Sequence, residues 1–347
     1  REPIRVEVYP DAETLARVSP LTVEEINRSG TIALCKYNRL MVVTPRALLR
    51  GYSWRDTLAH EYVHLVVTRL SKNRTPIWIH EGLAKHLESR WRSPAGRAAP
   101  MSPTQEHLLA NALRERKLIA WSKMHPSMAK LPSQRATALA FAQVQTAVEF
   151  LARRGGRRAL RKVIDACKRG RSSWEAVRAV TGLNKAQFDR QWRAHIAKLN
   201  LRLLPGLVPP ELRFSKRRSK EQRLAAIKEA KARRLLRLAG MLRSRRLTRA
   251  AIIEYEKART ILGQRNDLVA NHLARAYLEA GEPTKAVAVL RPVLEYYPEL
   301  PGPQVTMGVA QLRAGDPKAA ISHLKVALRI NPFTPELHCT LAEALGE

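Results

Sequence analysis

Residues 57–64 read TLAHEYVH, and residues 76–84 read PIWIHEGLA. These two stretches are the most informative part of the first half of the chain. Side chains four residues apart in an α-helix share one face, so His60 and His64 can bind a single ion. Glu61 lies one residue further round that helix and points at a water on the ion, while Glu81 from a second helix is an anionic third ligand. The two stretches therefore contain the parts of a zinc site with one open coordination position.

The residues around the first stretch are mostly apolar, which predicts a helix buried in a core. A buried helix seldom carries two histidines and a glutamate unless something satisfies them. The helix is expected to run from Trp54 to about residues 71–73, and Pro76 is expected to open the second helix. Glu81 follows His64 by 17 positions, which is enough for a turn and an antiparallel return.

Residues 54–90 closely resemble, and residues 1–199 loosely resemble, the gluzincin clan of zinc metallopeptidases in its bacterial peptidase-MA-like branch. In that branch a Trp-x-x-Glu-Gly-x-Ala segment supplies the third ligand. The resemblance implies one Zn²⁺ per chain, bound by His60, His64 and Glu81, with Glu61 as the general base that activates a zinc-bound water for peptide hydrolysis.

The sequence departs from that family at two positions. Many gluzincins place an acid one turn after the ligand glutamate to orient a ligand histidine, and here that position is Lys85. The related branch often has a tyrosine in a later helix that helps to hold the oxyanion, and here the position is Phe141, which has no hydroxyl.

Three further sets of residues are candidates for the site. Asp56, one turn before His60, is a candidate for orienting it, although a first-turn charge that serves the helix dipole is an equal alternative. His125 is a candidate oxyanion donor. Met41, Val42 and Val43 are candidate substrate-binding residues by analogy, because the strand beside the cleft of such peptidases is a sheet edge that binds extended substrate. An ordinary half-buried strand is at least as good an interpretation. We interpret His80, His86 and His107 as surface or packing residues.

The fold class predicted for the first domain is α+β and predominantly helical. Residues 1–92 form an α/β zinc lobe with strands expected at 4–9, 31–36 and 40–44, the last two as a hairpin. Residues 104–199 form a helical lobe, with helices expected at about 104–117, 133–153, 157–168, 173–180 and 185–199.

Residues 219–347 predict a second, all-helical domain after a Pro-containing basic linker at 200–218. Six pairs of identical residues lie 34 positions apart: Gly281 and Gly315, Pro283 and Pro317, Ala286 and Ala320, Leu290 and Leu324, Leu294 and Leu328, Pro298 and Pro332. This period is that of a tetratricopeptide repeat (TPR) α-solenoid. Repeats are expected at about 233–266, 267–300 and 301–334, with a final helix at 335–346 and a basic amphipathic helix at 219–244.

The chain of 347 residues has a net charge of +32, and residues 151–250 contain 30 Lys and Arg against 6 Asp and Glu. That density would attract an anionic partner. Nucleic acid is not expected, because no recognised nucleic-acid module accompanies the charge. No apolar run is long enough to span a membrane. The three distant cysteines are typical of isolated core thiols and leave the compartment open.

Two functions follow from these patterns. The first is a zinc metallopeptidase that acts on a polypeptide substrate and uses its TPR module to recruit that substrate or a protein partner. The second is a catalytically weak or inactive zincin-fold scaffold whose TPR array mediates protein–protein interaction, which Lys85 and Phe141 favour.

Overall fold

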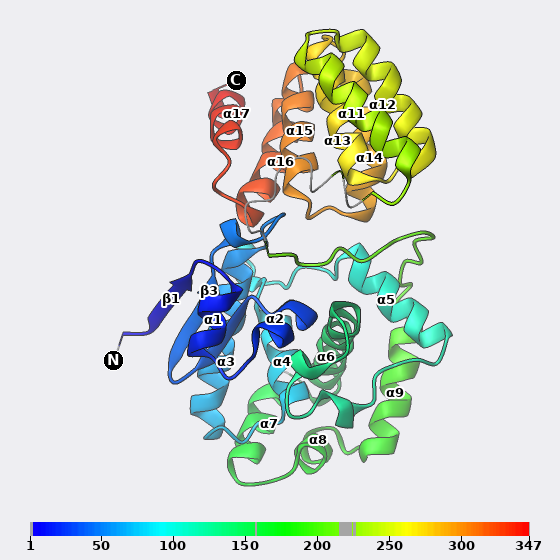
Figure 1. Ribbon diagram of the computed structural model, residues 1–347. Coiled ribbons are helices and arrows are strands. Elements are labelled where there is room, and N and C mark those ends of the chain that lie inside the picture. The colour runs from blue at the N-terminus through cyan, green and yellow to red at the C-terminus, as the bar shows by residue number, and fades with distance from the viewer. Residues whose placement is uncertain (1–2, 157, 215–223, 225–226, 347) are drawn as a thin grey trace. The chain divides into compact units, whose positions relative to one another are not determined.

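The chain divides into two compact units (Figure 1). The computed structural model describes residues 3–156, 158–214, 224 and 227–346. Unit 1 comprises Arg1–Thr44 and Trp54–Phe214, and unit 2 comprises Pro45–Ser53 and Ser215–Glu347. This division differs from the predicted one, because residues 200–214 lie with unit 1 and residues 45–53 with unit 2. Within the described ranges, no helix combines the length and apolar character needed to cross a bilayer.

Unit 1 begins with a small mixed sheet. Its strands β1 (Arg5–Tyr9), β2 (Ala33–Lys36) and β3 (Arg39–Val43) have the order β1-β3-β2. The predicted hairpin is confirmed, since β2 and β3 pair antiparallel around Tyr37 and Asn38, which have φ of 52° and 58°. The first strand pairs parallel with β3. Two short helices, α1 (Ala12–Val18) and α2 (Val23–Ser29), connect β1 to β2.

The prediction that Met41, Val42 and Val43 lie on an edge strand is wrong. Strand β3 is central, so its backbone groups are already paired on both sides by β1 and β2. All three side chains are buried. The unbroken apolar run is typical of a strand covered on both faces, whereas an alternating pattern is typical of one with a solvated face.

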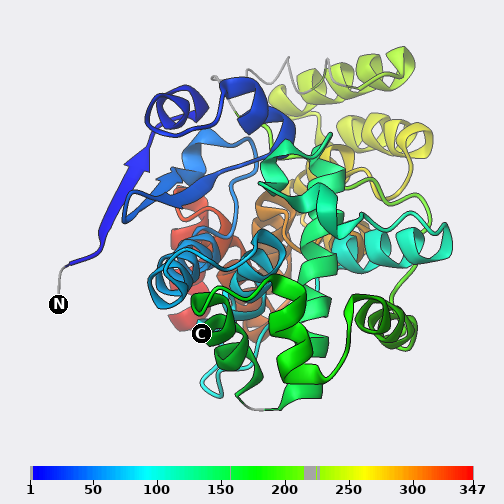
Figure 2. The ribbon, with the colours of Figure 1, turned by 90° about the horizontal axis from the view of Figure 1, so that it is seen from below.

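Helices α3 (Trp54–Ser71) and α4 (Ile77–Leu87) pack on each other, and α4 also packs on α6 (Gln134–Gly155). Gly82 makes the second contact close, because a Cβ there would lie 2.5 Å from Val148 Cγ2 and 2.6 Å from the Val144 carbonyl oxygen. Figure 2 shows the blue strands and the green helices on opposite sides of this helix pair.

The remaining helices of unit 1 form the predicted helical lobe. They are α5 (Pro103–Arg114), α7 (Ala159–Lys168), α8 (Ser173–Thr181) and α9 (Lys185–Ala197), with short 3₁₀ turns at Arg90–Arg92, Trp121–Met124 and Met128–Lys130. Their core is rich in aromatic rings that contact one another: Trp78, Trp121, Trp174, Phe188 and Trp192. This core supports α4 from the side opposite the sheet.

The first part of the predicted linker packs on unit 1. The Leu204 backbone N–H donates to His107 Nδ1 at 3.0 Å, and Leu212 N–H donates to Gln134 Oε1 at 2.7 Å. Leu204 and Leu207 are buried. Apolar side chains and satisfied backbone groups therefore hold residues 200–214 against unit 1, although the Pro and Gly content predicted a linker between domains.

Unit 2 is a series of helical hairpins: α11 (Ala230–Ser244) and α12 (Thr248–Leu262), α13 (Asp267–Glu279) and α14 (Pro283–Tyr296), α15 (Pro301–Arg313) and α16 (Pro317–Ile330), then α17 (Pro335–Gly346). The hairpins fall where the 34-residue period predicts them. Gly281 and Gly315 have φ of 77° and 81°, a left-handed conformation that glycine adopts without strain. Leu290 and Leu324 are fully buried. The predicted repeat architecture is confirmed at each of these positions.

The predicted helix over residues 219–244 is confirmed only from Ala230. Residues 227–229 are not helical, and residues 219–223 and 225–226 lie outside the described part of the chain. Of the apolar side chains predicted to share one side of this helix, Leu224 and Ile227 are buried, Leu235 and Leu242 are partly buried, and Leu238 is exposed. The buried face of α11 also includes Ala232, Leu236 and Ala239. Small residues on this face let α12 approach closely.

The segment Pro45–Ser53 joins β3 to α3 but belongs to unit 2. Its Tyr52 backbone N–H donates to the Ile330 carbonyl at 3.2 Å, and Arg50 pairs with Asp267 at 2.6 Å. Gly51 has φ of +66°, and a Cβ there would lie 2.8 Å from the Ile330 carbonyl oxygen. The chain thus leaves unit 1, contacts the repeat helices of unit 2 and returns as the helix that carries His60.

Candidate metal centre

Helix α3 buries a polar face. His60, Glu61 and His64 are each less than a tenth exposed. Their side chains offer one nitrogen or oxygen atom each, and these atoms all lie within 4.8 Å of one another. The helix brings the three together because positions i, i+1 and i+4 point into one sector of its surface.

Glu81 on α4 completes this group. Its Oε2 atom lies 3.1 Å from His60 Nε2 and 3.3 Å from His64 Nε2. Donor atoms around a tetrahedral zinc with bonds of about 2.0–2.1 Å are separated by about 3.3 Å. Two imidazole nitrogens and a carboxylate oxygen are also donors that zinc prefers. The spacing and the chemistry of these three side chains therefore fit a zinc ion.

Glu61 has an unsatisfied oxygen. Its Oε2 atom is buried, and no side chain or backbone group of the described residues hydrogen-bonds to it. Burial raises the pKa of this carboxyl group above its usual value, despite the opposing effect of His64 and His60. A buried carboxylate oxygen without a partner is costly unless an ion or a water satisfies it.

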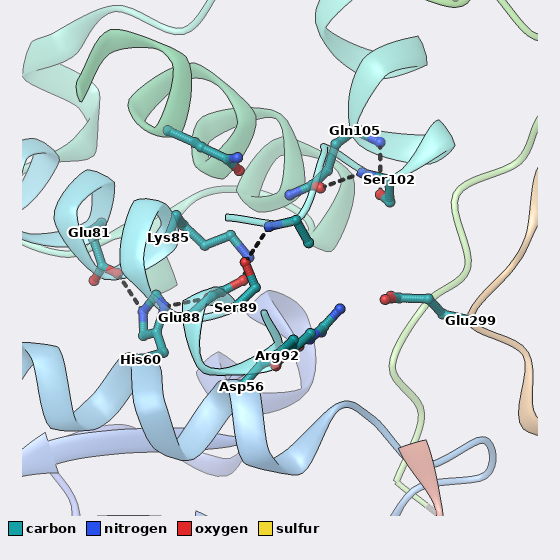
Figure 3. A network of polar contacts seen from close by, with 12 residues as sticks. Asp56, His60, Glu81, Lys85, Glu88, Ser89, Arg92, Ser102, Gln105 and Glu299 are labelled. Atoms are coloured by element: carbon teal, nitrogen blue, oxygen red, sulfur yellow. Dashed lines mark hydrogen bonds and ion pairs between the residues drawn. The ribbon is translucent and has the colours of Figure 1, made fainter. Parts of the chain in front are cut away.

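His60 is held in place by a second carboxylate (Figure 3). Its Nδ1–H donates to Glu88 Oε2 at 2.8 Å, which leaves Nε2 as the ring nitrogen facing Glu81. Burial lowers the pKa of His60, but the hydrogen bonds to Glu81 and Glu88 outweigh it and raise the value to about 10. Glu88 therefore fixes which ring nitrogen can bind an ion.

Lys85 takes part in the same network. Its ammonium group pairs with Glu88. Burial would raise the pKa of Glu88, yet the charge of Lys85 and the contact with His60 lower it, so this carboxylate stays ionised. Many members of the family have an acid one turn after the ligand glutamate, at the position of Lys85. Here Glu88, three residues after Lys85, contacts the ligand histidine instead. A spacing of seven from Glu81 keeps Glu88 on the same helix face, and this signal was present in the sequence.

Asp56 has other partners. It accepts hydrogen bonds from Trp91 Nε1 at 3.0 Å and from Arg92 Nε at 2.8 Å. Because Glu88 occupies the Nδ1 side of His60, the orienting role suggested for Asp56 falls to Glu88. Asp56 instead connects the first turn of α3 to the turn that follows α4.

His80, which we expected to be a packing residue, contacts His64. Their Nδ1 atoms are 2.5 Å apart and their rings stack at 4.6 Å. Burial, followed by the charge of His64, lowers the pKa of His80 to about 3, so His80 is neutral. It accepts from His64 Nδ1–H and can donate from Nε2 to Thr68 Oγ1 at 3.2 Å. This contact directs His64 Nε2 toward Glu81.

A family model described as the Peptidase MA superfamily matches residues 1–198, which is more than half of the chain. The chain belongs to the Peptidase MA superfamily. No match was found among curated proteins.

Two solved structures show weak similarity. The Sgt2 TPR domain from Aspergillus fumigatus is 18% identical, with 34% of this chain and 79% of that chain covered and a TM-score of 0.33. A chain of the APC/C hetero-tetramer Cut9-Hcn1 is 14% identical. The match covers 85% of this chain and 48% of that chain, with a TM-score of 0.32. These scores are too low to establish a shared fold, so the repeat architecture rests on the helices of unit 2 themselves.

Phe141 and Lys85, where the sequence departs from the family, both lie near the cluster. The Phe141 ring lies 6.0 Å from the His60 ring, so the position where the family often has a tyrosine does face the cluster. Lys85 Nζ lies 5.8 Å from the centre of the same ring. His125 is exposed after the 3₁₀ turn Trp121–Met124, and among the described residues no hydrogen bond joins it to the cluster. Its role as oxyanion donor stays a prediction.

Proposed function

We propose that unit 1 is a zinc-dependent peptidase and that unit 2 recruits its polypeptide substrate or a protein partner. The observation that carries the proposal is the approach of His60 Nε2 and His64 Nε2 to one oxygen of Glu81, beside the unsatisfied oxygen of Glu61. Membership of the Peptidase MA superfamily supports the same reaction class.

Zn²⁺ held by His60, His64 and Glu81 would polarise the scissile carbonyl and lower the pKa of a water to about 7. The chain supplies the proton transfers. Glu61 accepts a proton at its free Oε2 from the attacking water and then delivers it to the leaving amine. Its raised pKa brings it closer to the working pH, which favours both steps.

The neighbouring side chains hold the ligands in the reactive orientation. Glu88 accepts from Nδ1 of His60, and His80 accepts from Nδ1 of His64, so each ring presents Nε2 to the same point. Lys85 compensates the charge of Glu88, which would otherwise be a second buried carboxylate beside Glu81. Such outer contacts typically affect metal affinity or activity by about 10–100-fold.

The alternative function is a scaffold with weak or no activity, and one observation favours it. Phe141 places an apolar ring 6.0 Å from His60, where a hydroxyl would stabilise developing negative charge. Loss of one oxyanion donor typically costs about 100–1,000-fold in turnover. On this alternative unit 1 cleaves peptide bonds slowly or not at all, and recruitment by unit 2 is the main activity.

The substitution Glu61→Gln tests the proposal. Zinc content is measured by elemental analysis, and cleavage of an unfolded protein such as reduced casein is followed by electrophoresis. We expect zinc in both proteins and cleavage reduced by about 100-fold or more in the variant, since the base is lost and the ligands remain. The control is Glu24→Gln at an exposed position in the first turn of α2. Zinc binding without cleavage by the unaltered protein would favour the scaffold, and absence of zinc would exclude the peptidase and leave the scaffold.

A further inference from the structure

Helix α11 has two dissimilar faces. One face, which includes Ala232, Leu236 and Ala239, is buried and packs in the same apolar cluster as Tyr255 of α12. Figure 1 shows these two helices side by side within unit 2. The opposite face of α11 is exposed, and its composition is not that of an ordinary solvated helix surface.

The exposed face carries uncompensated positive charge. Residues 230–253 contain eight Lys and Arg and no Asp or Glu. Arg243 pairs with Glu279, and Arg233 donates to the Ile227 carbonyl. The other six are exposed and form no ion pair with any described residue: Lys231, Arg234, Arg237, Arg245, Arg246 and Arg249. Neighbouring like charges repel one another, so this surface gains free energy when an anionic partner screens it.

Large apolar side chains lie among these charges. Leu238 is 41% exposed, Met241 56% and Leu247 52%. Positions 234, 238, 241 and 245 follow one side of α11 and its C-cap, so Arg234 and Arg245 flank the apolar side chains of Leu238 and Met241. We name this surface the α11 ridge and define it by Arg234, Arg237, Leu238, Met241, Arg245, Arg246 and Leu247.

Unit 1 has a second basic surface, and there exposed cations occur without exposed large apolar side chains. Residues 151–200 contain exposed cations such as Arg154, Arg158 and Lys162. None of the described residues from 93 to 202 is an exposed large hydrophobic side chain. The apolar residues of the α11 ridge are therefore not a general consequence of the basic composition of the chain.

The combination of side chains selects among anionic partners. A second copy of the chain would set arginine against arginine. Single-stranded nucleic acid is bound by cations together with aromatic rings that stack on bases, and the ridge has no aromatic residue. A lipid surface uses both elements of the ridge, because phosphates bind the guanidinium groups while Leu and Met side chains enter the boundary of the acyl chains.

We propose that the α11 ridge binds an anionic phospholipid surface and so holds the protein peripherally at a membrane. Each basic residue near such a surface strengthens binding about fivefold. The proposal is independent of the metal centre, since it uses no residue of unit 1.

Vesicle co-sedimentation of the full chain tests this proposal, with phosphatidylglycerol–phosphatidylcholine vesicles compared with vesicles of phosphatidylcholine alone. We expect binding to the anionic vesicles only. Reversal of Arg234, Arg237, Arg245 and Arg246 to Glu is expected to weaken that binding by more than about 100-fold. The matched control reverses Arg154, Arg158, Lys162 and Arg169, four exposed cations of unit 1 with the same total charge change. It is expected to retain most of the binding.

A second variant separates lipid from other anions. Leu238→Ser with Met241→Ser keeps every charge and leaves the buried residues Ala232, Leu236 and Ala239 of α11 unchanged, and it is expected to weaken vesicle binding about tenfold or more. Circular dichroism verifies that the helices remain. The proposal is overturned if the control reversal weakens binding as much as the ridge reversal. It is also overturned if the double serine variant binds vesicles normally, or if the ridge binds an oligonucleotide or polyglutamate but not the vesicles.

Discussion

Helix α3 and the repeat helices α13–α16 bury side chains of opposite kinds, polar in α3 and mainly apolar in the repeats. Helix α3 buries His60, Glu61 and His64, whose polar atoms are satisfied through neighbouring side chains or not at all. The repeat helices bury Leu290, Leu324 and a series of alanines, whose contribution comes from apolar area alone. Polar burial costs free energy and is retained where it serves a ligand or a reaction, whereas apolar burial stabilises the fold. The comparison indicates that the buried polar residues of α3 serve a functional site, whereas the buried apolar residues of the repeats stabilise the fold.

The largest expected effect on stability lies in the repeats. Leu324 is fully buried and packs directly over Gly308, where a Cβ would lie 2.6 Å from Leu324 Cγ. The substitution Leu324→Ala is expected to lower the free energy of unfolding of unit 2 by about 2–5 kcal/mol, since it leaves a cavity. Hydrogen exchange of the repeat amides measures the change. Leu238→Ala, at an exposed position, is the control and should change it by less than about 1 kcal/mol. Equal losses in both variants would contradict the assignment of the buried face.

The next largest effect is a loss of zinc affinity when the side chains that contact the proposed zinc ligands are changed. Glu88→Gln keeps an acceptor for His60 Nδ1 but removes the negative charge, and Glu88→Ala removes both. We expect zinc affinity to fall by about 10–100-fold in the alanine variant and by less in the glutamine variant. Chelator competition measures the affinities. Asp56→Asn is the matched control, since Asp56 bonds Trp91 and Arg92 instead. A larger loss of zinc affinity from Asp56→Asn than from Glu88→Ala would mean that Asp56, and not Glu88, orients His60.

The sequence predicted the repeats well because their information is local and periodic. Gly281 and Pro283 recur at Gly315 and Pro317, and each pair specifies the same turn and helix start. The bounds of α3 followed equally from its apolar pattern. The exposure of Leu238 on α11 was not predicted, because small residues such as Ala232 and Ala239, which occupy the buried face, carry a weak hydrophobic signal.

Non-local features of unit 1 could not be predicted in the same way. Strand order depends on pairing between segments far apart, so the central position of β3 was not visible in its own residues. The membership of residues 45–53 in unit 2 depends on contacts with Asp267 and Ile330, more than 200 residues away. At the candidate site, a motif identified His60, His64 and Glu81. The spacing from Glu81 to Glu88 was a further signal in the sequence, whereas the contact of His80 with His64 required the geometry of α4 on α3.

The polar face of α3 also predicts a pH effect. The pKa of His60 in the metal-free protein is raised to about 10, because the hydrogen bonds to Glu81 and Glu88 outweigh burial. His60 is therefore protonated at neutral pH and must lose that proton to bind a metal. Zinc affinity should rise by up to about tenfold per pH unit from pH 7 to 9 and fall as the pH is lowered. Calorimetry in buffers of different ionisation enthalpy should detect proton release. Affinity that does not change over this range would contradict the expected protonation.

The smallest effect concerns the segment that joins β3 to α3. Arg50 and Asp267 form an ion pair that is about a third exposed on each side, so solvent screens it. Arg50→Ala should lower the stability of unit 2 by less than about 1 kcal/mol. The exchanged pair Arg50→Asp with Asp267→Arg should restore part of the loss, as a double-mutant cycle would detect. A loss of several kcal/mol from Arg50→Ala would mean that the segment is a larger part of the repeat core.

Zinc stoichiometry distinguishes a metal centre on α3 and α4 from a polar cluster that binds no ion. The protein is stripped with a chelator, dialysed against one equivalent of Zn²⁺ and assayed by elemental analysis, together with His60→Ala, His64→Ala and Glu81→Ala. The account predicts one zinc per chain in the unaltered protein and affinity reduced by about 100-fold or more in each variant. His338→Ala, at an exposed position in unit 2, should retain the metal. Failure of the unaltered protein to take up zinc, or uptake that none of the three variants reduces, would contradict it.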